Sequence, residues 1–173
     1  MISLREIGLN IGDLAARLPI IQGGMGIGVS LSRLASAVAN QGGIGVISAA
    51  GIGMSEPDFS INYLEANIRA FRKEIRKARE LTKGILGVNI MVVLSNFGDM
   101  AKTAIEEGID IIFSGAGLPL NLPVFLKESK ATKLVPIVSS ARAAGIIAKR
   151  WLDKYQYAPD AIGPSTTMAS GAY

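Results

Sequence analysis

Glycines and small polar residues recur in this sequence directly after short apolar runs. The segment PIIQGGMGIG, from Pro19 to Gly28, places four glycines and a methionine behind a strand-like Leu-Pro-Ile-Ile. A Gly-rich turn after a strand lets backbone N–H groups approach a ligand closely, so a phosphate or a similar acceptor-rich group is the first chemistry to consider. Later apolar runs end in Ser48-Ala49, Asn89, Ser114-Gly115 and Ser139-Ser140. None of these groups is charged, and as a set they suit a neutral polar ring system with an anionic tail.

The glycine spacing excludes two common nucleotide-binding motifs. Gly-x-Gly recurs along the chain, but no copy continues to a glycine three places on, so the dinucleotide fingerprint is not met. The chain has no Gly-Lys-Ser/Thr, which excludes the phosphate loop of nucleoside triphosphatases. Spacing alone leaves two interpretations open: the glycines approach a ligand, or they permit tight turns and close packing of helices on strands.

Asn89 interrupts an otherwise apolar run, Gly87-Val-Asn-Ile-Met-Val-Val. A buried amide is costly unless hydrogen-bond partners are supplied for its oxygen and its nitrogen. Taken alone, the residue favours a ligand contact and hydrogen bonds to neighbouring backbone equally.

The chain contains no His and no Cys. Disulfides, thiolate nucleophiles, Ser-His-Asp triads, histidine general bases and the usual zinc sites are therefore excluded for this chain on its own. We accordingly predict no metal site, and we expect a cofactor to carry any chemistry.

The elements that would position these residues alternate along the chain. Short runs rich in Ile and Val predict strands at Pro19–Gln22, Ile44–Ser48, Ile85–Ile90, Ile109–Phe113 and Leu134–Ser139. Helical patterns follow them at Leu31–Asn40, Phe59–Thr82, Phe97–Glu107, Leu122–Ser129 and Ala141–Tyr155. Ala161-Ile162 is a candidate for the start of a sixth strand. This series of βα units predicts a parallel sheet, doubly wound or closed into a barrel, whose strands end at the edge where such folds bind ligands.

A basic segment from Arg69 to Lys83 lies within the longest predicted helix. The 18 Lys and Arg residues exceed the 14 Asp and Glu residues, which gives a net charge of +4. The segment interleaves Glu74 and Glu80 and keeps apolar residues at three- and four-residue spacing, which is typical of an amphipathic helix with a solvated outer face. We prefer this interpretation to a nucleic-acid site, since no aromatic-interleaved basic motif accompanies it.

Nothing in the sequence predicts a membrane segment or a leader. No apolar run approaches the ~18 residues that a membrane span needs. The N-terminal segment carries Glu6 and Asp13 and lacks the uninterrupted apolar stretch of a signal peptide. We therefore expect a cytoplasmic protein.

Five motifs taken together resemble those of the FMN-dependent nitronate monooxygenases, formerly called 2-nitropropane dioxygenases, and of the related FMN-dependent enoyl-ACP reductases. In chain order they are LPIIQGGMG from Leu18, LASAVANQGGIGVI from Leu34, GVNIM from Gly87, SGAGLP from Ser114 and VSSARAA from Val138. The motifs stand at the expected strand ends, and the resemblance covers the chain from about Leu14 to Ile162.

The resemblance implies a (β/α)8 barrel of the TIM type that holds FMN at its carboxyl-terminal mouth. The positions that would contact or surround the flavin are Gly23, Gly24, Met25, Asn89, Ser114, Ser139 and Ser140. The glycines of this set would let the chain lie against the flat isoalloxazine, with N–H groups facing its polar edge. The methionine would contact the ring face, and the asparagine would hydrogen-bond the flavin. The implied reaction is the oxidation of an alkyl nitronate with oxygen.

The resemblance ends near Ile162. In the family a sixth strand leads to a segment with a catalytic His, and later Gly-rich loops bind the FMN phosphate; this chain has no His, so we assign it no catalytic residue. Residues 1–162 would form the N-terminal portion of the barrel, about five βα units. Residues 163–173 would form a tail outside the family pattern, with a composition typical of disorder. We therefore expect a truncated, frame-shifted or deliberately cut member of the family.

An incomplete parallel barrel leaves its first and last strands without partners, so we expect association, for example as a homo-oligomer that buries these edges. Three functions follow. The first is an FMN-dependent oxidoreductase of the nitronate monooxygenase type that is inactive as this chain. The alternatives are a non-catalytic barrel fragment and an FMN-dependent enoyl-ACP reductase, which would need a nicotinamide cofactor and an acyl-carrier partner.

Overall fold

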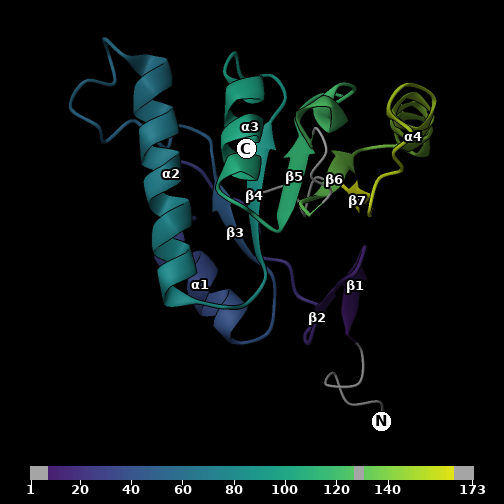
Figure 1. Cartoon of the computed structure of the whole chain (residues 1–173), viewed down its shortest axis with the longest axis horizontal. Helices are drawn as coiled ribbons and strands as arrows, with labels where there is room; N and C mark the ends of the chain where they lie inside the picture. The colour runs from purple at the N-terminus through teal and green to yellow at the C-terminus, as the bar shows by residue number, and fades with distance from the viewer. Residues whose placement is uncertain (1–7, 127–130, 166–173) are drawn as a thin grey trace.

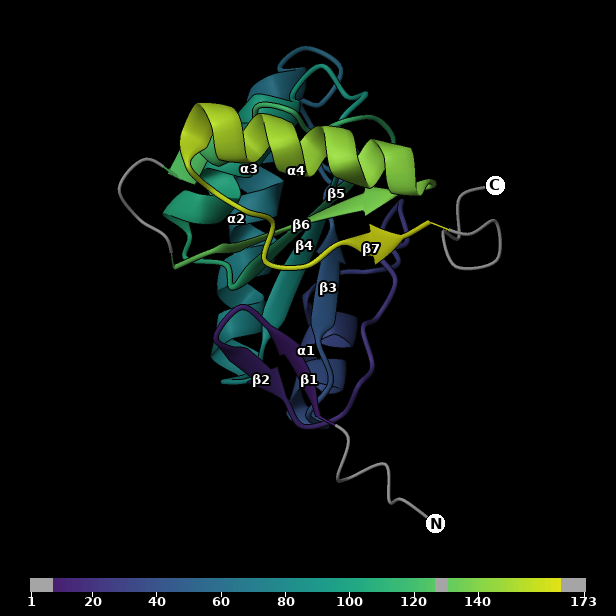
Figure 2. The same cartoon turned by 90° about the vertical axis from the view of Figure 1, so that its right-hand side faces the viewer.

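The computed structural model describes residues 8–126 and 131–165, which form a parallel sheet with helices on one face and a small hairpin against the other (Figure 1, Figure 2). The strands of the sheet are neighbours in chain order: β3 (Gly45–Ser48), β4 (Leu86–Met91), β5 (Ile111–Gly115), β6 (Lys133–Val138) and β7 (Gly163–Pro164). The helices are α1 (Ser32–Asn40), α2 (Tyr63–Leu81), α3 (Phe97–Glu106), the 3₁₀ helix η2 (Leu122–Leu126) and α4 (Ala141–Tyr155). The predicted alternation of strands and helices in a parallel sheet is confirmed.

The register of the sheet determines which residues share a face. Ser48, Asn89, Phe113 and Val135 lie opposite one another in a single row across β3 to β6. Successive side chains of a strand point to opposite faces. Asn89 and its row therefore face away from the helices, because their neighbour Val88 lies in the helix-side core.

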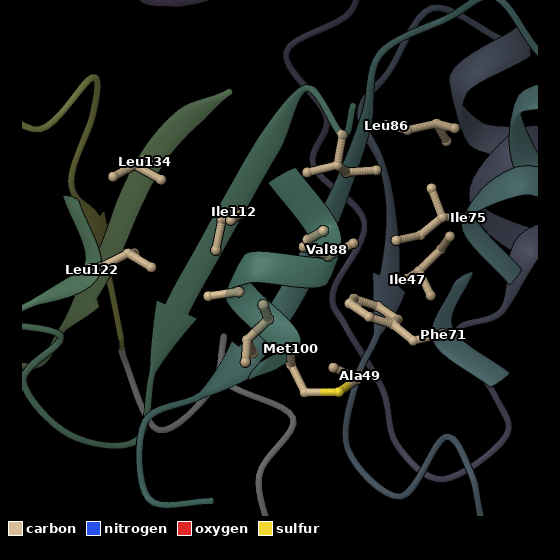
Figure 3. Packing of buried hydrophobic residues seen from close by; sticks show 14 of the residues in the cluster. Ile47, Ala49, Phe71, Ile75, Leu86, Val88, Met100, Ile112, Leu122 and Leu134 are labelled. Carbon is tan, nitrogen blue, oxygen red and sulfur yellow. The ribbon is translucent and has the colours of Figure 1, made fainter. Parts of the chain in front are cut away.

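The helix-side core is built from apolar residues of the sheet and of every helix. Figure 3 shows its central part, where Phe71 and Ile75 of α2 and Met100 of α3 lie beside Val88 and Ile47 of the strands. All five side chains are fully buried. Burial of one such side chain contributes about 1.5–3 kcal/mol, so this layer holds the strands in place beneath the site.

A hairpin that the sequence did not predict covers part of the opposite face. It consists of β1 (Leu9–Ile11) and β2 (Leu14–Ala16), which pair antiparallel. Ile11 and Ala16 pack in one cluster with Ile111 and Val135 of the sheet. An ion pair between Lys133 Nζ and Asp13 Oδ1, at 2.7 Å, ties the hairpin turn to β6.

The predicted first strand, Pro19–Gln22, forms only one bridge with the sheet. Ile21 pairs with Ile44 just before β3. The Ile44 N–H donates to the Ile20 carbonyl (2.8 Å), and the Gln22 N–H donates to the Ile44 carbonyl (3.0 Å). The ladder stops there because Pro19 has no N–H to donate and the main chain leaves the sheet after Gln22.

The last strand, β7, directly follows the candidate Ala161-Ile162. β7 pairs through Gly163 with Ile137 and through Pro164 with Val138, so these two residues belong to the sheet and not to the predicted tail. Residues 166–173 of that tail lie outside the described residues. The helix predicted over Leu122–Ser129 is the 3₁₀ helix η2, and residues 127–130 are likewise not described.

The basic outer face of α2 is paired with carboxylates of neighbouring segments. Four of its arginines form ion pairs: Arg69 with Glu56 and Asp58, Arg72 with Glu106 and Glu107, Arg76 with Glu107, and Arg79 with Asp110. Exposed pairs of this kind contribute about 0–1 kcal/mol each. Because these arginines are already paired with carboxylates, the arrangement favours a solvated helix face over a nucleic-acid site. Within residues 8–126 and 131–165, neither α2 nor any other helix is long and apolar enough to cross a membrane.

Candidate functional site

The Gly-rich segment, residues 23–30, forms a closed loop beside β3, which we call the glycine loop. The Ser30 Oγ accepts a hydrogen bond from the Met25 N–H (2.9 Å) and donates one to the Gly23 carbonyl (3.1 Å). The Ser30 N–H donates to the Met25 carbonyl (3.0 Å), and the Ser48 N–H at the end of β3 donates to the Ser30 carbonyl (2.9 Å). The loop is thus closed on itself and attached to the carboxyl end of β3 by one serine.

Most backbone N–H groups of the glycine loop remain free. Those of residues 23, 24 and 26–29 have no hydrogen-bond acceptor in the part of the chain that the structure describes. Grouped N–H donors at the carboxyl end of a parallel sheet are typical of sites for acceptor-rich ligands. The loop therefore offers donors without any cationic side chain.

Gly24 lies directly on the side chain of Asn89. A Cβ placed on Gly24 would stand 2.4 Å from the Asn89 Cβ, so only glycine permits this approach. Asn89 is half-buried, and its side-chain amide makes no hydrogen bond with the described residues around it. The neighbouring backbone therefore does not satisfy the amide, which leaves it open to a ligand or to water.

Two other predicted residues of the loop are open to solvent. Nothing lies within 4 Å of a Cβ placed on Gly23. The Met25 side chain is 43% exposed. The loop thus leaves room for a ligand at Gly23 and presents a polarizable thioether next to it.

Ser48 belongs to this site, although sequence reasoning noted it only as a strand-end residue. It stands next to Asn89 in the sheet register, and only 3% of it is exposed. Its Oγ has no partner among the described residues, and a Cβ placed on Gly26 would stand 3.5 Å from this oxygen. Ser48 therefore lies directly beneath the glycine loop. The signal that could have identified it is its position at the end of a strand adjacent to Asn89.

The three other predicted serines do not join this group. Ser114 lies opposite Ile90 of the helix-side core and is fully buried, so its side chain is turned away from the face of Asn89. Ser140 caps α4, because its Oγ accepts a hydrogen bond from the Ala143 N–H (3.2 Å). Ser139 is exposed at the end of β6. Ser139 and Ser140 are both exposed, and of the two only the Ser140 hydroxyl is engaged as a helix cap in the described residues.

A shallow groove lies along the outer face of α2. It is lined by residues of that helix alone: Glu65, Ile68, Arg69, Arg72, Lys73, Arg76, Lys77 and Glu80. Ligand sites of parallel α/β folds are built instead from the loops after several strands. The groove is therefore a less suitable site than the glycine loop.

The glycine loop suits a planar, acceptor-rich ring better than a metal ion. Its groups are backbone N–H donors, the amide of Asn89, which both donates and accepts, and the thioether of Met25. Within the described residues no three His, Cys, Asp or Glu side chains are grouped so that they could hold a metal. A flavin ring has carbonyl oxygens and ring nitrogens along its edge and an apolar face, so the residues present fit it.

The strands of the sheet follow one another in chain order and the helices cover one face (Figure 1), as in the (β/α)8-barrel class and unlike a doubly wound sheet, which has helices on both faces. Within that class, the family model for nitronate monooxygenase matches residues 10–162, and the chain belongs to this family.

Two solved structures and one curated protein are similar to the chain. FabK from Thermotoga maritima has 34% sequence identity and a TM-score of 0.60, covering 76% of this chain and 37% of that one. A nitroalkane oxidase from Streptomyces ansochromogenes has a TM-score of 0.61 over 78% of this chain and 44% of that one; its 19% identity shows a likeness of fold. A (3aS,4S,5R,7aS)-5-hydroxy-7a-methyl-1-oxo-octahydro-1H-indene-4-carboxyl-CoA dehydrogenase from Mycobacterium tuberculosis is 29% identical over 130 residues.

The chain spans 32% of the length of that curated relative and less than half of each of the two structures. The described strands accordingly form part of a barrel, with five of them in one parallel sheet. The predicted fold class, an incomplete barrel of the TIM type, is confirmed.

Proposed function

We propose that the glycine loop and Asn89 hold the isoalloxazine ring of FMN in an oxidoreductase that oxidises alkyl nitronates with oxygen. Membership of the nitronate monooxygenase family supports the class of reaction. The observation that carries the cofactor assignment is the unpartnered amide of Asn89, which lies against Gly24 at the carboxyl end of β4.

Each residue of the site has a role in this proposal. The free N–H groups of Gly23 and Gly24 donate to acceptors on the ring edge, and the Met25 thioether contacts the ring face. Asn89 orients the ring from the sheet side, and exposed Ser139 is a further contact at the edge. Bound FMN would supply the two-electron redox chemistry that side chains cannot provide. We leave out Ser114 and Ser140, since the first faces the helices and the second caps α4.

The site contains no group able to move a proton near neutral pH. Its side chains are an amide, hydroxyls and a thioether, none of which titrates in that range. We therefore propose that the chain binds flavin but does not turn over nitronates without an acid–base group from outside it. Assay of the purified chain with an alkyl nitronate and oxygen tests this point.

The cofactor assignment is tested by adding FMN to the purified chain, removing free FMN by desalting and recording the visible spectrum. The unmodified chain is expected to retain flavin absorption. Asn89→Leu keeps the branched shape and the number of side-chain heavy atoms but replaces the amide by methyl groups. It is expected to weaken FMN binding about tenfold, the equivalent of about 1.4 kcal/mol, without lowering stability. Asn10→Leu, at an exposed position of β1, serves as the control.

Two outcomes contradict the assignment. One is a colourless unmodified chain, which favours the interpretation as a non-catalytic barrel fragment. The other is equal retention of flavin by Asn89→Leu and by the unmodified chain, which would place the flavin elsewhere.

A second candidate is the reduction of an enoyl thioester, as in the FMN-dependent enoyl-ACP reductases. It is favoured by the identity to FabK, 34%, which exceeds the 19% identity to the nitroalkane oxidase. The two candidates differ in the electron donor. Anaerobic bleaching of bound flavin by NADH or NADPH supports the reductase, whereas bleaching by an alkyl nitronate alone supports the monooxygenase.

A further inference from the structure

The side chain of Gln22 takes the place of a strand residue beside β3. Its Oε1 accepts a hydrogen bond from the Val46 N–H (3.3 Å), and its Nε2 donates to the Val46 carbonyl (3.0 Å). One side-chain amide thus bonds both the N–H and the carbonyl of Val46. In a regular sheet the backbone of a neighbouring strand would make these two hydrogen bonds. The main chain is free to leave the sheet after Gln22 and to form the glycine loop.

The same amide reaches the glycine loop itself. The Gln22 Nε2 lies 2.9 Å from the Ser30 Oγ and 3.2 Å from the Gly23 carbonyl. Ser30 is fully buried, and its hydroxyl accepts from Gln22 and Met25 while it donates to Gly23. The donor and both acceptor positions of this hydroxyl are therefore used. The bonds form a continuous network from β3 to the loop.

We infer that Gln22 and Ser30 are positioning residues that hold the glycine loop in its ligand-binding shape before the ligand arrives. This inference rests on the proposed function, in which the loop receives the flavin ring. A loop with four glycines has a large conformational freedom to lose on binding. A network that removes this freedom beforehand increases affinity without touching the ligand.

Flavin affinity provides the first test. Ser30→Ala removes the hydroxyl at the centre of the network and is expected to raise the dissociation constant for FMN about tenfold. Ser36→Ala is the matched control: Ser36 is buried on α1, and its hydroxyl donates only to the Arg33 carbonyl. The control is expected to change the dissociation constant by less than about twofold, although it also removes a buried hydroxyl.

Gln22→Glu is a second variant, for the case in which Ser30→Ala does not fold. It keeps the size of the side chain but replaces the Nε2 donor by an oxygen that faces two carbonyl oxygens and the Ser30 Oγ. We expect a similar loss of FMN affinity. The variant that carries both substitutions is expected to have the same dissociation constant for FMN as the single variant that binds FMN less tightly. The two effects should not add, because both substitutions break the same network.

Amide hydrogen exchange tests the network without flavin. In the unmodified chain the Met25 amide, which donates to Ser30 and Gly23, is expected to exchange more slowly than the free amides of Gly24 and Gly26. In Ser30→Ala or Gln22→Glu the Met25 amide is expected to exchange as fast as that of Gly24, while Val88 in the core keeps its rate.

The outcomes separate this inference from the proposed function. A chain that binds no FMN contradicts the proposed function, and the exchange rates then decide the inference. Met25 exchanging as fast as Gly24 in the unmodified chain would overturn it. Where FMN binds, equal effects of Ser30→Ala and Ser36→Ala on the dissociation constant would also overturn it.

Discussion

Gly23 and Gly24 are adjacent in the chain but have different surroundings. A Cβ on Gly24 would collide with the Asn89 Cβ at 2.4 Å, whereas a Cβ on Gly23 would meet nothing within 4 Å. Gly24 is therefore required for the loop to rest on β4, and Gly23 is the position where a ligand has room. The two interpretations of the glycines, close packing and ligand approach, thus apply to different residues.

Gly24→Ala is expected to lower the free energy of unfolding by about 1–3 kcal/mol, because the loop must move away from Asn89. Gly23→Ala is expected to change it by less than about 0.5 kcal/mol. Urea unfolding followed by circular dichroism measures both. Equal destabilisation by the two substitutions would contradict the packing of Gly24 on Asn89.

Folding shifts the titration of Tyr157, a half-buried tyrosine near the carboxyl-terminal end of the described residues. Burial, together with a hydrogen bond to the Asp160 carboxylate and its charge, raises the pKa of Tyr157 above its ordinary value of 10.0. Above pH 10 the unfolded chain releases this proton while the folded chain retains it. The unfolded state then binds fewer protons, so stability falls with rising pH.

We expect the free energy of unfolding to fall as the pH rises from about 9.5 to about 11. The fall begins there because the tyrosine of the unfolded chain loses its proton near its ordinary pKa of about 10. Tyr157→Phe cannot release a proton and should show a shallower decrease over the same range. Unfolding in urea at several pH values measures this difference. Parallel pH profiles for the two proteins would show that Tyr157 does not contribute.

At the scale of elements, the same arrangement of an aspartate occurs at the amino-terminal ends of two pairs of strands, and we call it the aspartate clamp. The Asp110 N–H donates to the Leu86 carbonyl (3.2 Å), and Asp110 Oδ2 accepts from the Leu86 N–H (2.8 Å). Asp160 makes the same two bonds with Leu134, at 3.2 and 2.8 Å. Each clamp ties the start of one strand to its neighbour, at the end of the sheet opposite to the site.

Asp160→Ala is expected to destabilise the fold by about 1–3 kcal/mol, since the N–H of buried Leu134 loses its acceptor. Asp153→Ala, at an exposed position on α4, is expected to change stability by less than about 0.5 kcal/mol. Thermal unfolding compares them. If both variants unfold at the same temperature as the unmodified chain, the clamp does not stabilise the sheet.

At the scale of the whole molecule, the sheet has two open edges within the described residues. One is the segment around Ile21, which bridges only to Ile44, and the other is the two-residue strand β7. Ile21 is 44% exposed. Exposed edges with apolar side chains promote pairing with other chains. Association through these edges therefore remains our prediction.

Sedimentation velocity at increasing protein concentration is expected to show association of the unmodified chain. Ile21→Lys places a charge at the open edge and should shift the distribution toward the monomer. Ile61→Lys, in the exposed loop before α2, is the control for a simple gain of charge. A monomer at all concentrations, or equal effects of the two lysines, would contradict association through this edge.

The sequence by itself determined the alternation of strands and helices from Ile44 onward and the parallel sheet. A ligand site at the carboxyl edge of this sheet is a prediction from the same pattern. These properties follow from local hydrophobic periodicity and from the direction of the strands, which depend on residues near one another in the chain. Asn89 and the glycines could be proposed as site residues for the same reason.

Only the tertiary structure decided which strand-end residues face the site. Ser48 and Asn89 share one face while Ser114 is turned to the other, because the register between strands places them so. The replacement of a strand residue by the Gln22 amide and the packing of the β1–β2 hairpin also join segments distant in sequence. Such contacts depend on cross-strand register and packing, which local periodicity does not encode.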